Sequence, residues 1–175
     1  MYWPKPKDRH DELLLGFIHS EYSPLSARRC PWYYGVPVGI RMLASKYGKD
    51  AKHLSNLCKE IDAVGVNVEG RTAVWEWGHT PRERPISKKY FIKCWLNRWP
   101  IFENKEVWII EVKTKKEIEK EGLWRAIGQV FGYKTLFEDD WPSAKVVGLG
   151  IVCEDSDELG EYACQKLGIR IWKIE

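Results

Sequence analysis

Hydrophobic and polar positions divide the chain into alternating helical and extended segments. Short runs rich in apolar and β-branched residues predict strands at 61–68, 72–77, 107–112, 145–153 and 169–174. Apolar positions and flanking stop signals predict helices at 11–19, 38–47, 51–58, 87–99, 117–137 and 156–167. Ser156 is the expected N-cap of the last helix, and Gly168 is expected to end it. Because strands and helices alternate after residue 107, we expect an α/β fold with a partly parallel sheet.

The segments between these elements contain no repeat and no interdomain linker. Residues 1–9 are expected to form an extended arm, and the proline- and glycine-bearing segment 23–37 is expected to be a loop. We therefore predict a single domain over residues 1–175, with an N-terminal helical region to about residue 58. The segment 69–105, with a turn at 80–85, is interpreted as an insertion into that domain. The expected architecture is a mixed central β-sheet flanked by helices.

Composition excludes few classes of function. Hydrophobic residues make up 44% and charged residues 30% of the chain, as in ordinary globular domains. The net charge of +3 neither requires nor forbids a nucleic-acid partner. No run of 18 apolar residues predicts a membrane span, and the first residues lack the apolar core of a signal peptide, so we expect a cytoplasmic protein. The five cysteines form no CxxC pair, and no glycine-rich phosphate loop supports a nucleotide cofactor.

The residues Glu111-Val112-Lys113 lie at the C-terminal end of a hydrophobic strand. Side chains alternate along a strand, so Glu111 and Lys113 are expected on the same face. A carboxylate can bind a hard divalent cation, and a neighbouring lysine can orient water or neutralise a phosphate. Asp62 lies within another apolar strand, where an unpartnered charge is costly. If the two strands are neighbours, Asp62 and Glu111 can share one metal ion.

This order of residues resembles the PD-(D/E)XK nucleases. The residues that carry the resemblance are Asp62 in the first strand, the Glu111-Val112-Lys113 triplet in the second and Gln129 in the following helix. The resemblance covers roughly residues 57–175 without the insertion, and it implies a restriction-endonuclease-like core. Ile61 stands where the family pattern has proline, and 49 positions separate Asp62 from Glu111.

The resemblance implies a Mg²⁺- or Mn²⁺-dependent hydrolase that cuts DNA. It implies Asp62, Glu111 and the Val112 backbone carbonyl as metal ligands, and Lys113 as the group that orients water or stabilises charge. It also implies an acidic residue on an N-terminal helix, for which Glu12 is the first match and Glu21 the second. Two-strand cutting would favour a homodimer.

Further candidates lie around this core. Arg125, Gln129 and Tyr133 recur every four positions and therefore share one helix face, which suits phosphate or site contacts. Arg28 and Arg29, followed by the aromatic residues 32–34, are candidate nucleic-acid contacts. A basic cluster in the insertion is a candidate backbone clamp, and it consists of Arg82, Arg84, Lys88, Lys89 and Lys93. His10-Asp11-Glu12 looks metal-like, but its place near the terminus favours a surface position.

Two alternatives compete with a nuclease. The same fold can serve as a catalytically silent module that binds nucleic acid or a protein. An unrelated α/β protein can also carry the Glu-Val-Lys triplet by accident, in which case Asp62 and Glu111 would lie on different faces of the sheet.

Overall fold

The computed structural model describes residues 6–27, 29–68, 74–75 and 88–175. Within these ranges one mixed sheet has the strand order β3-β1-β2-β4-β5-β6. The antiparallel pairs are β1–β2 and β2–β4, and the parallel pairs are β1–β3, β4–β5 and β5–β6. The strands are β1 (Trp32–Val38), β2 (Lys59–Val66), β3 (Val74–Trp75), β4 (Glu106–Lys113), β5 (Lys145–Cys153) and β6 (Ile169–Lys173). The expected α/β class with a mixed sheet is confirmed.

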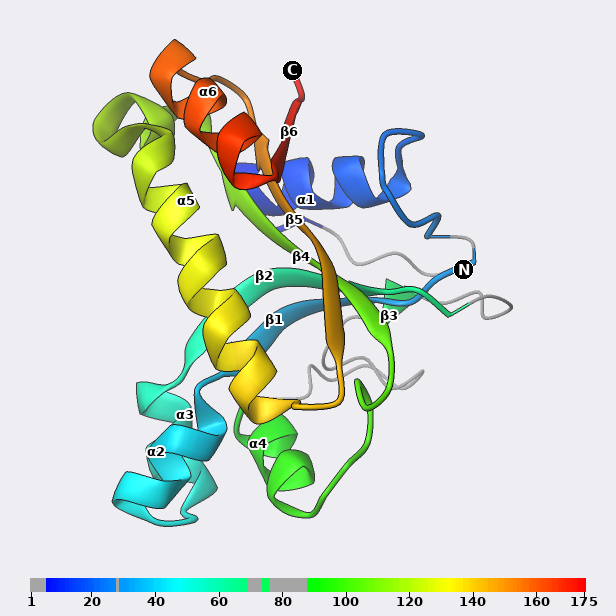
Figure 1. Ribbon diagram of the computed structural model, residues 1–175, viewed down its shortest axis with the longest axis vertical. Coiled ribbons are helices and arrows are strands. Elements are labelled where there is room, and N and C mark those ends of the chain that lie inside the picture. Colours follow the sequence, from blue (N-terminus) through cyan, green and yellow to red (C-terminus); the bar gives the residue numbers. More distant parts are fainter. Residues whose placement is uncertain (1–5, 28, 69–73, 76–87) are drawn as a thin grey trace.

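Helices cover both faces of this sheet (Figure 1). They are α1 (Arg9–His19), α2 (Ile40–Tyr47), α3 (Ala51–Leu57), α4 (Lys88–Leu96), α5 (Lys115–Asp140) and α6 (Glu158–Leu167). One buried cluster joins α1 to side chains of β1, β2, β4, β5 and β6. A larger cluster joins the same sheet to residues of α2 to α6. The layer on the α1 face is therefore thin, and the long helix α5 dominates the other face. None of the helices in the described ranges is long and apolar enough to cross a membrane.

The second half of the segment 23–37, expected to be a loop, is a strand, so the N-terminal region to about residue 58 also contributes to the sheet. Residues Trp32–Val38 form β1, which lies between β2 and β3. Gly35 and Pro37 conceal the strand in the sequence. Pro37 pairs with Glu60 of β2, whereas β3 pairs only with Trp32 and Tyr33. At Pro37 the described part of β3 therefore does not pair with β1. Proline has no backbone N–H, and a position without a strand on its outer side tolerates this lack.

The start of α6 and the course of α5 differ from the expectation. Asp157, not Ser156, is the N-cap of α6, because its carboxylate accepts the Gly160 N–H at 2.7 Å. The same carboxylate accepts the Leu123 N–H at 3.2 Å, where Gly122 interrupts α5 with a φ of 63°. The helix expected over 117–137 is therefore kinked near its start. Gly168 ends α6 in the left-handed conformation, as expected.

The described parts of the segment 69–105, which was interpreted as an insertion, pack against the rest of the domain. They add β3 to the edge of the sheet and α4 to the larger hydrophobic cluster, through Phe91 and Ile92. The turn expected at 80–85 lies outside the described residues.

Candidate metal centre between β2 and β4

The candidate site forms where β2 and β4 separate. Their pairing runs from Val66–Val107 to Ala63–Ile110 and stops there. β4 continues beside β5 to Lys113. Within the described residues, the last residues of β4 therefore form no backbone hydrogen bonds with β2. A side chain of β2 accepts a hydrogen bond from the β4 backbone instead. Asp62 Oδ2 accepts the Val112 N–H at 2.7 Å.

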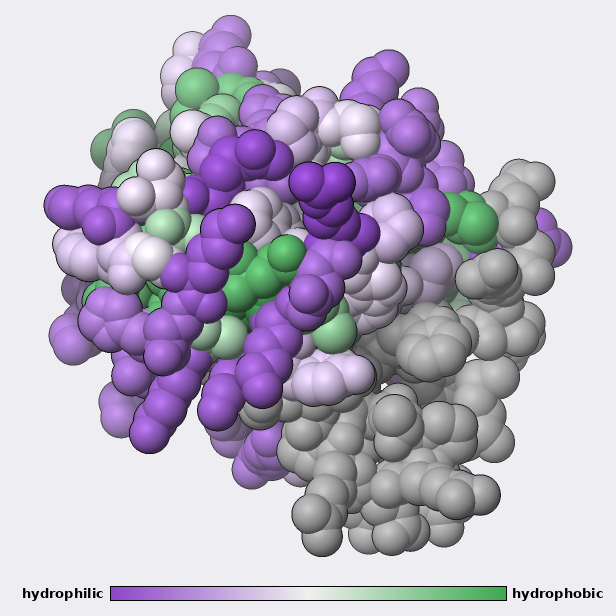
Figure 2. Space-filling view, turned by 90° about the horizontal axis from the view of Figure 1, so that it is seen from below, coloured by the Kyte–Doolittle hydropathy of each residue, from purple (hydrophilic) through white to green (hydrophobic). Residues whose placement is uncertain are grey.

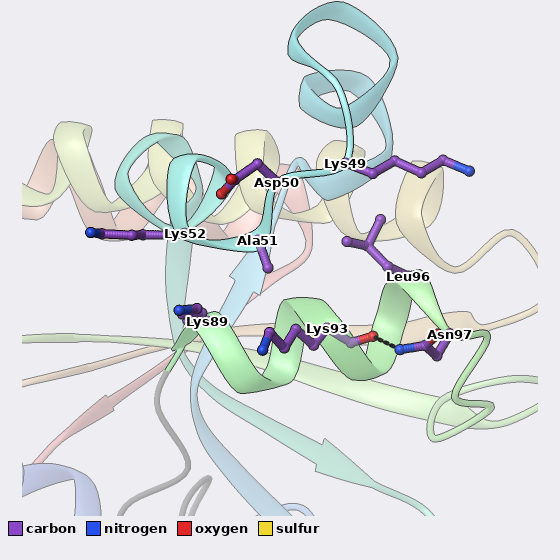
Figure 3. A pocket seen from close by; sticks show the side chains of 8 residues that line it. All are labelled: Lys49, Asp50, Ala51, Lys52, Lys89, Lys93, Leu96 and Asn97. Carbon is purple, nitrogen blue, oxygen red and sulfur yellow. Dashed lines mark hydrogen bonds between the residues drawn. The ribbon is translucent and has the colours of Figure 1, made fainter.

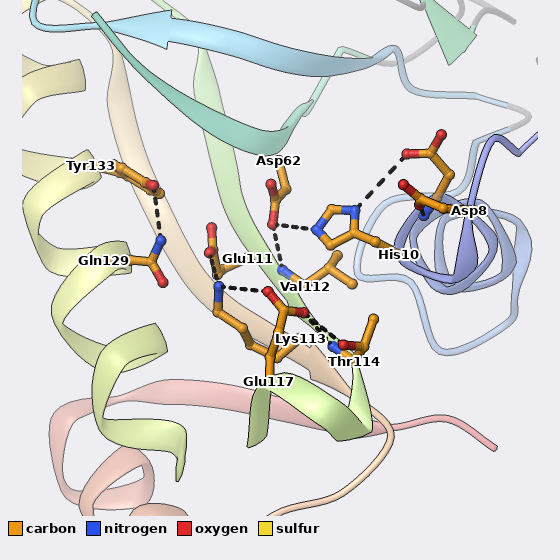
Figure 4. A network of polar contacts seen from close by, with 11 residues as sticks. Asp8, His10, Asp62, Glu111, Val112, Lys113, Thr114, Glu117, Gln129 and Tyr133 are labelled. Atoms are coloured by element: carbon orange, nitrogen blue, oxygen red, sulfur yellow. Dashed lines mark hydrogen bonds and ion pairs between the residues drawn. The ribbon is translucent and has the colours of Figure 1, made fainter. Parts of the chain in front are cut away.

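Asp62 lies at a shift in the alternation of β2. Ile61 packs in the cluster on the α5 face, whereas Ala63 packs in the cluster on the α1 face. A regular strand would direct residues two positions apart to the same face. β1 shifts at the matching place, because Gly35 lies between the pairs Tyr34–Ala63 and Val36–Ile61 and has a φ of 58°. Asp62 is thus directed into the gap between β2 and β4 (Figure 4).

Glu111 and Lys113 share one face of β4, as expected. Lys113 Nζ donates to Glu111 Oε1 at 2.8 Å, and both residues are buried. Lys113 Nζ also lies 3.7 Å from Glu117 Oε1. Glu117 belongs to the capping box that begins α5, where its Oε2 accepts the Thr114 N–H at 2.8 Å. The start of α5 therefore helps to fix the ammonium group beside Glu111.

The electrostatics of this pair are unequal. Burial raises the pKa of Glu111 to about 8, and the negative charge of Asp62 acts in the same direction, although Lys113 opposes both. Burial would lower the pKa of Lys113, but Glu111 outweighs it and holds that pKa above its ordinary value. Lys113 therefore stays charged at neutral pH. Asp62 and Glu111 are close enough for the charge of one to raise the pKa of the other, although Lys113 lies beside Glu111.

The sequence pattern favoured a surface position for His10, but His10 is part-buried at the site. Its Nε2 lies 3.2 Å from Asp62 Oδ2, and this hydrogen bond raises the pKa of His10 to about 9. The helical period could have indicated this position, because His10 precedes the buried Leu13 and Leu14 by three and four positions and therefore lies on the same helix face. Glu12 does not share that face, and its carboxylate pairs with Arg9 at 3.2 Å.

Two of the three predicted α5 residues face the site. Gln129 Nε2 donates to the Tyr133 hydroxyl at 3.1 Å, and Figure 4 shows both side chains on the Glu111 side of the gap. Burial raises the pKa of Tyr133, and the charge of Glu111 adds to the effect. Arg125 instead pairs with Glu121 one turn earlier, and its side chain is 59% exposed.

Within the part of the chain that the structure describes, two buried side-chain oxygen atoms at this site are without a hydrogen-bond partner. They are Glu111 Oε2 and Gln129 Oε1. Such atoms are costly unless something binds them. The Val112 carbonyl points to the same side of β4 as its N–H, which faces Asp62. An all-oxygen set of this kind suits a hard divalent cation such as Mg²⁺ or Mn²⁺, so the residues fit the implied metal.

A second group of metal-type side chains lies at the start of α1. Ligand atoms of Asp8, His10 and Asp11 lie within 4.8 Å of one another. The local structure of the helix start already engages them. Asp8 is the N-cap and accepts the Asp11 N–H at 3.0 Å, and Asp11 accepts the Lys7 N–H at 3.1 Å. We assign this group to helix capping.

The predicted nucleic-acid contacts before β1 are only partly described. Arg29 is exposed, and Arg28 lies outside the described residues. Trp32 does not offer a stacking surface, because it is fully buried and donates its Nε1–H to the Leu25 carbonyl at 3.1 Å. Trp32 is therefore a core residue.

Comparison with family models, with curated proteins and with solved structures finds no match to this chain. The geometry of the site is therefore the basis for any assignment of function.

Proposed function

We propose that the protein is a metal-dependent nuclease of the PD-(D/E)XK type that hydrolyses phosphodiester bonds in DNA. One observation carries the proposal: within the described residues no donor satisfies the buried Glu111 Oε2, while the Asp62 carboxyl group lies close to Glu111 and the Lys113 ammonium group donates to the other oxygen, Oε1. A buried carboxylate in such surroundings is costly unless a cation completes it. The second rival, an accidental triplet, requires Asp62 and Glu111 to lie on separate faces, and their electrostatic contact argues against it.

The arrangement of elements supports the same proposal. Asp62 is in β2, Glu111 and Lys113 are in the neighbouring β4, and Gln129 is in α5, which directly follows β4. This order resembles the restriction-endonuclease-like core that the sequence pattern implies. The parallel strands β5 and β6, joined by α6, supply the expected strand–helix–strand tail.

Asp62, Glu111 and the Val112 carbonyl would hold the metal. A divalent cation there would polarise the scissile phosphate and lower the pKa of a bound water. His10 and the Val112 N–H both engage Asp62 Oδ2, so they fix the carboxylate, and its other oxygen, Oδ1, would be the ligand atom.

Lys113 and Gln129 would act on the reacting groups. Lys113 keeps its positive charge in a buried position, where it can orient the attacking water or stabilise the negative charge that develops on the phosphate. Gln129 Oε1 has no protein partner and can accept a hydrogen bond from that water. Tyr133 holds the amide of Gln129 in place.

The test is incubation of single-stranded, duplex and branched DNA with the wild type, Glu111→Ala and Lys113→Ala, in Mg²⁺ and in EDTA. We expect Mg²⁺-dependent cleavage by the wild type and a loss of roughly a hundredfold or more in each variant, as when a group that stabilises transition-state charge is removed. Lys145→Ala, an exposed lysine at the start of β5, is the matched control. Cleavage that survives in Glu111→Ala would refute the proposal, and DNA binding without cleavage by the wild type would favour the silent module.

A further inference from the structure

A second candidate site lies between α3 and α4, outside the metal centre. It is an open groove of about 740 Å³. The segment before α3 and α3 itself form one wall, and α4 with the residue after it forms the other (Figure 3). The lining residues are Lys49, Asp50, Ala51, Lys52, Lys89, Lys93, Leu96 and Asn97. The groove thus brings together lysines from two distant parts of the sequence.

The groove carries an excess of positive charge, because its lining has four lysines and one aspartate. All four lysines are exposed, and within the described ranges none of their ammonium groups lies at ion-pair distance from a carboxylate. Asp50 is the acid in the lining and the N-cap of α3; the His53 N–H that it accepts at 2.8 Å lowers its pKa, and the charge of Lys89 adds to this, so Asp50 offsets part of the lysine charge. Like charges gathered in this way repel one another, and an anionic ligand would relieve the repulsion.

The shape and chemistry of the groove suit a row of phosphates. Lys89, Lys93 and Asn97 follow one another at four-residue spacing, so they form a stripe with one position per helical turn of about 5.4 Å. Lysine is a point charge that binds phosphate without demanding one orientation. Among the described residues, the lining contains no aromatic side chain on which a base could stack. Figure 2 shows hydrophilic side chains standing around a small apolar hollow on the face that α2 to α4 form.

The groove is connected to the metal centre through β2. α3 ends at Leu57, and Asp62 follows in β2, about 13 Å beyond Cys58 at the rise of an extended strand. Lys88 belongs to this connection and not to the groove, because its Nζ donates to the Cys58 carbonyl at 2.7 Å. We propose that the groove binds the phosphodiester backbone of a nucleic-acid strand, independently of base sequence. The inference rests on the proposed function only in taking this strand to be the nuclease's own substrate.

The experiment measures the affinity of the full chain for a labelled DNA oligonucleotide in EDTA, where hydrolysis is stopped, over a series of salt concentrations. For a single strand, the plot of log affinity against log salt concentration has a negative slope, and each lost phosphate contact reduces the magnitude of this slope by about 0.7. We expect Lys89→Ala with Lys93→Ala to lower the slope by about 1.4 and to weaken binding alike for unrelated sequences. The matched control is Lys145→Ala with Lys166→Ala, two exposed lysines outside the groove.

The outcomes separate this inference from the proposed function. Glu111→Ala should bind DNA with the wild-type salt slope. If the wild type fails to cleave DNA but the groove variant still lowers the slope, the nuclease proposal fails and the groove stands. An equal slope in the groove variant and the control would overturn the groove, as would absence of DNA binding by the wild type. Binding of phosphatidylserine vesicles that depends on Lys89 and Lys93, without DNA binding, would also overturn it. Circular dichroism of each variant establishes that it folds.

Discussion

At the scale of residues, burial and the negative charge of Asp62 both raise the pKa of Glu111, so the stability of the fold depends on the ionisation of this side chain. Its pKa is about 8 in the folded protein, against an ordinary value of 4.5. The folded state therefore binds this proton more tightly than the unfolded state does. In the absence of a cation, the contribution of Glu111 to the free energy of unfolding is fully present below 4.5 and is lost as the pH rises through about 8.

We therefore predict opposite effects of Glu111→Gln with and without metal. In EDTA near pH 8 the variant should be more stable than the wild type, because it removes a buried charge that Lys113 balances only in part. Millimolar Mg²⁺ should raise the melting temperature of the wild type by about 2–4 °C and leave that of the variant unchanged. Thermal unfolding followed by circular dichroism checks both expectations. An Mg²⁺ effect of the same size in the variant would contradict the assignment of Glu111 as a ligand.

At the scale of elements, the paired irregularity in β1 and β2 is what directs Asp62 toward Glu111. Gly35 has a φ of 58°, and its Cβ position is free of neighbours, so backbone conformation and not space restricts the residue there. An L side chain in this conformation is strained by about 1–2 kcal/mol. Backbone strain at position 35 would disturb the pairing of β1 with β2 next to Asp62.

We predict that Gly35→Ala lowers the free energy of unfolding by about 1 kcal/mol and reduces the cleavage rate per folded molecule. The matched control is Gly16→Ala in α1, where there is also space for the Cβ and no positive φ. This control should be neutral or slightly stabilising. Urea unfolding and the nuclease assay measure the two effects. If Gly35→Ala matches Gly16→Ala in both, the irregularity does not control Asp62.

At the scale of the whole molecule, the two hydrophobic clusters support different parts of the structure: the cluster on the α1 face holds the helix that carries His10, and the larger cluster packs the opposite face of the sheet. α1 brings His10 to Asp62, and Phe17 anchors this helix. Phe17 is fully buried, and its ring centroid lies 4.7 Å from that of Trp172 and 6.3 Å from that of Trp32. On the other face, Phe102 is equally buried against Phe137.

Phe17→Ala and Phe102→Ala should each cost about 3–5 kcal/mol of stability, because each leaves a cavity in a core. Only Phe17→Ala should also weaken catalysis by the molecules that remain folded, since it loosens the helix that holds Asp62 through His10. Denaturant titration gives the stability of each variant, and cleavage rates corrected for the folded fraction give the activity. Equal corrected rates would show that α1 does not position the site.

The sequence by itself determined the features that depend on local period. Apolar runs located β2, β4, β5 and β6 within a few residues. Strand alternation put Glu111 and Lys113 on one face, and Gly168 marked the end of α6. These features follow from backbone geometry within a single element, so a short window of residues contains the information.

Only the tertiary structure decided how distant segments meet. Pairing with β2 made a strand of 32–38 in spite of Gly35 and Pro37. The separation of β2 from β4 directed Asp62 to the Val112 N–H and to His10. The packing of α4 on α3 gathered Lys89 and Lys93 with Lys49 and Lys52. Local periodicity specifies which face of an element is buried. The register between two strands, and an irregularity within one strand, depend instead on contacts throughout the core, which a short window of residues does not contain.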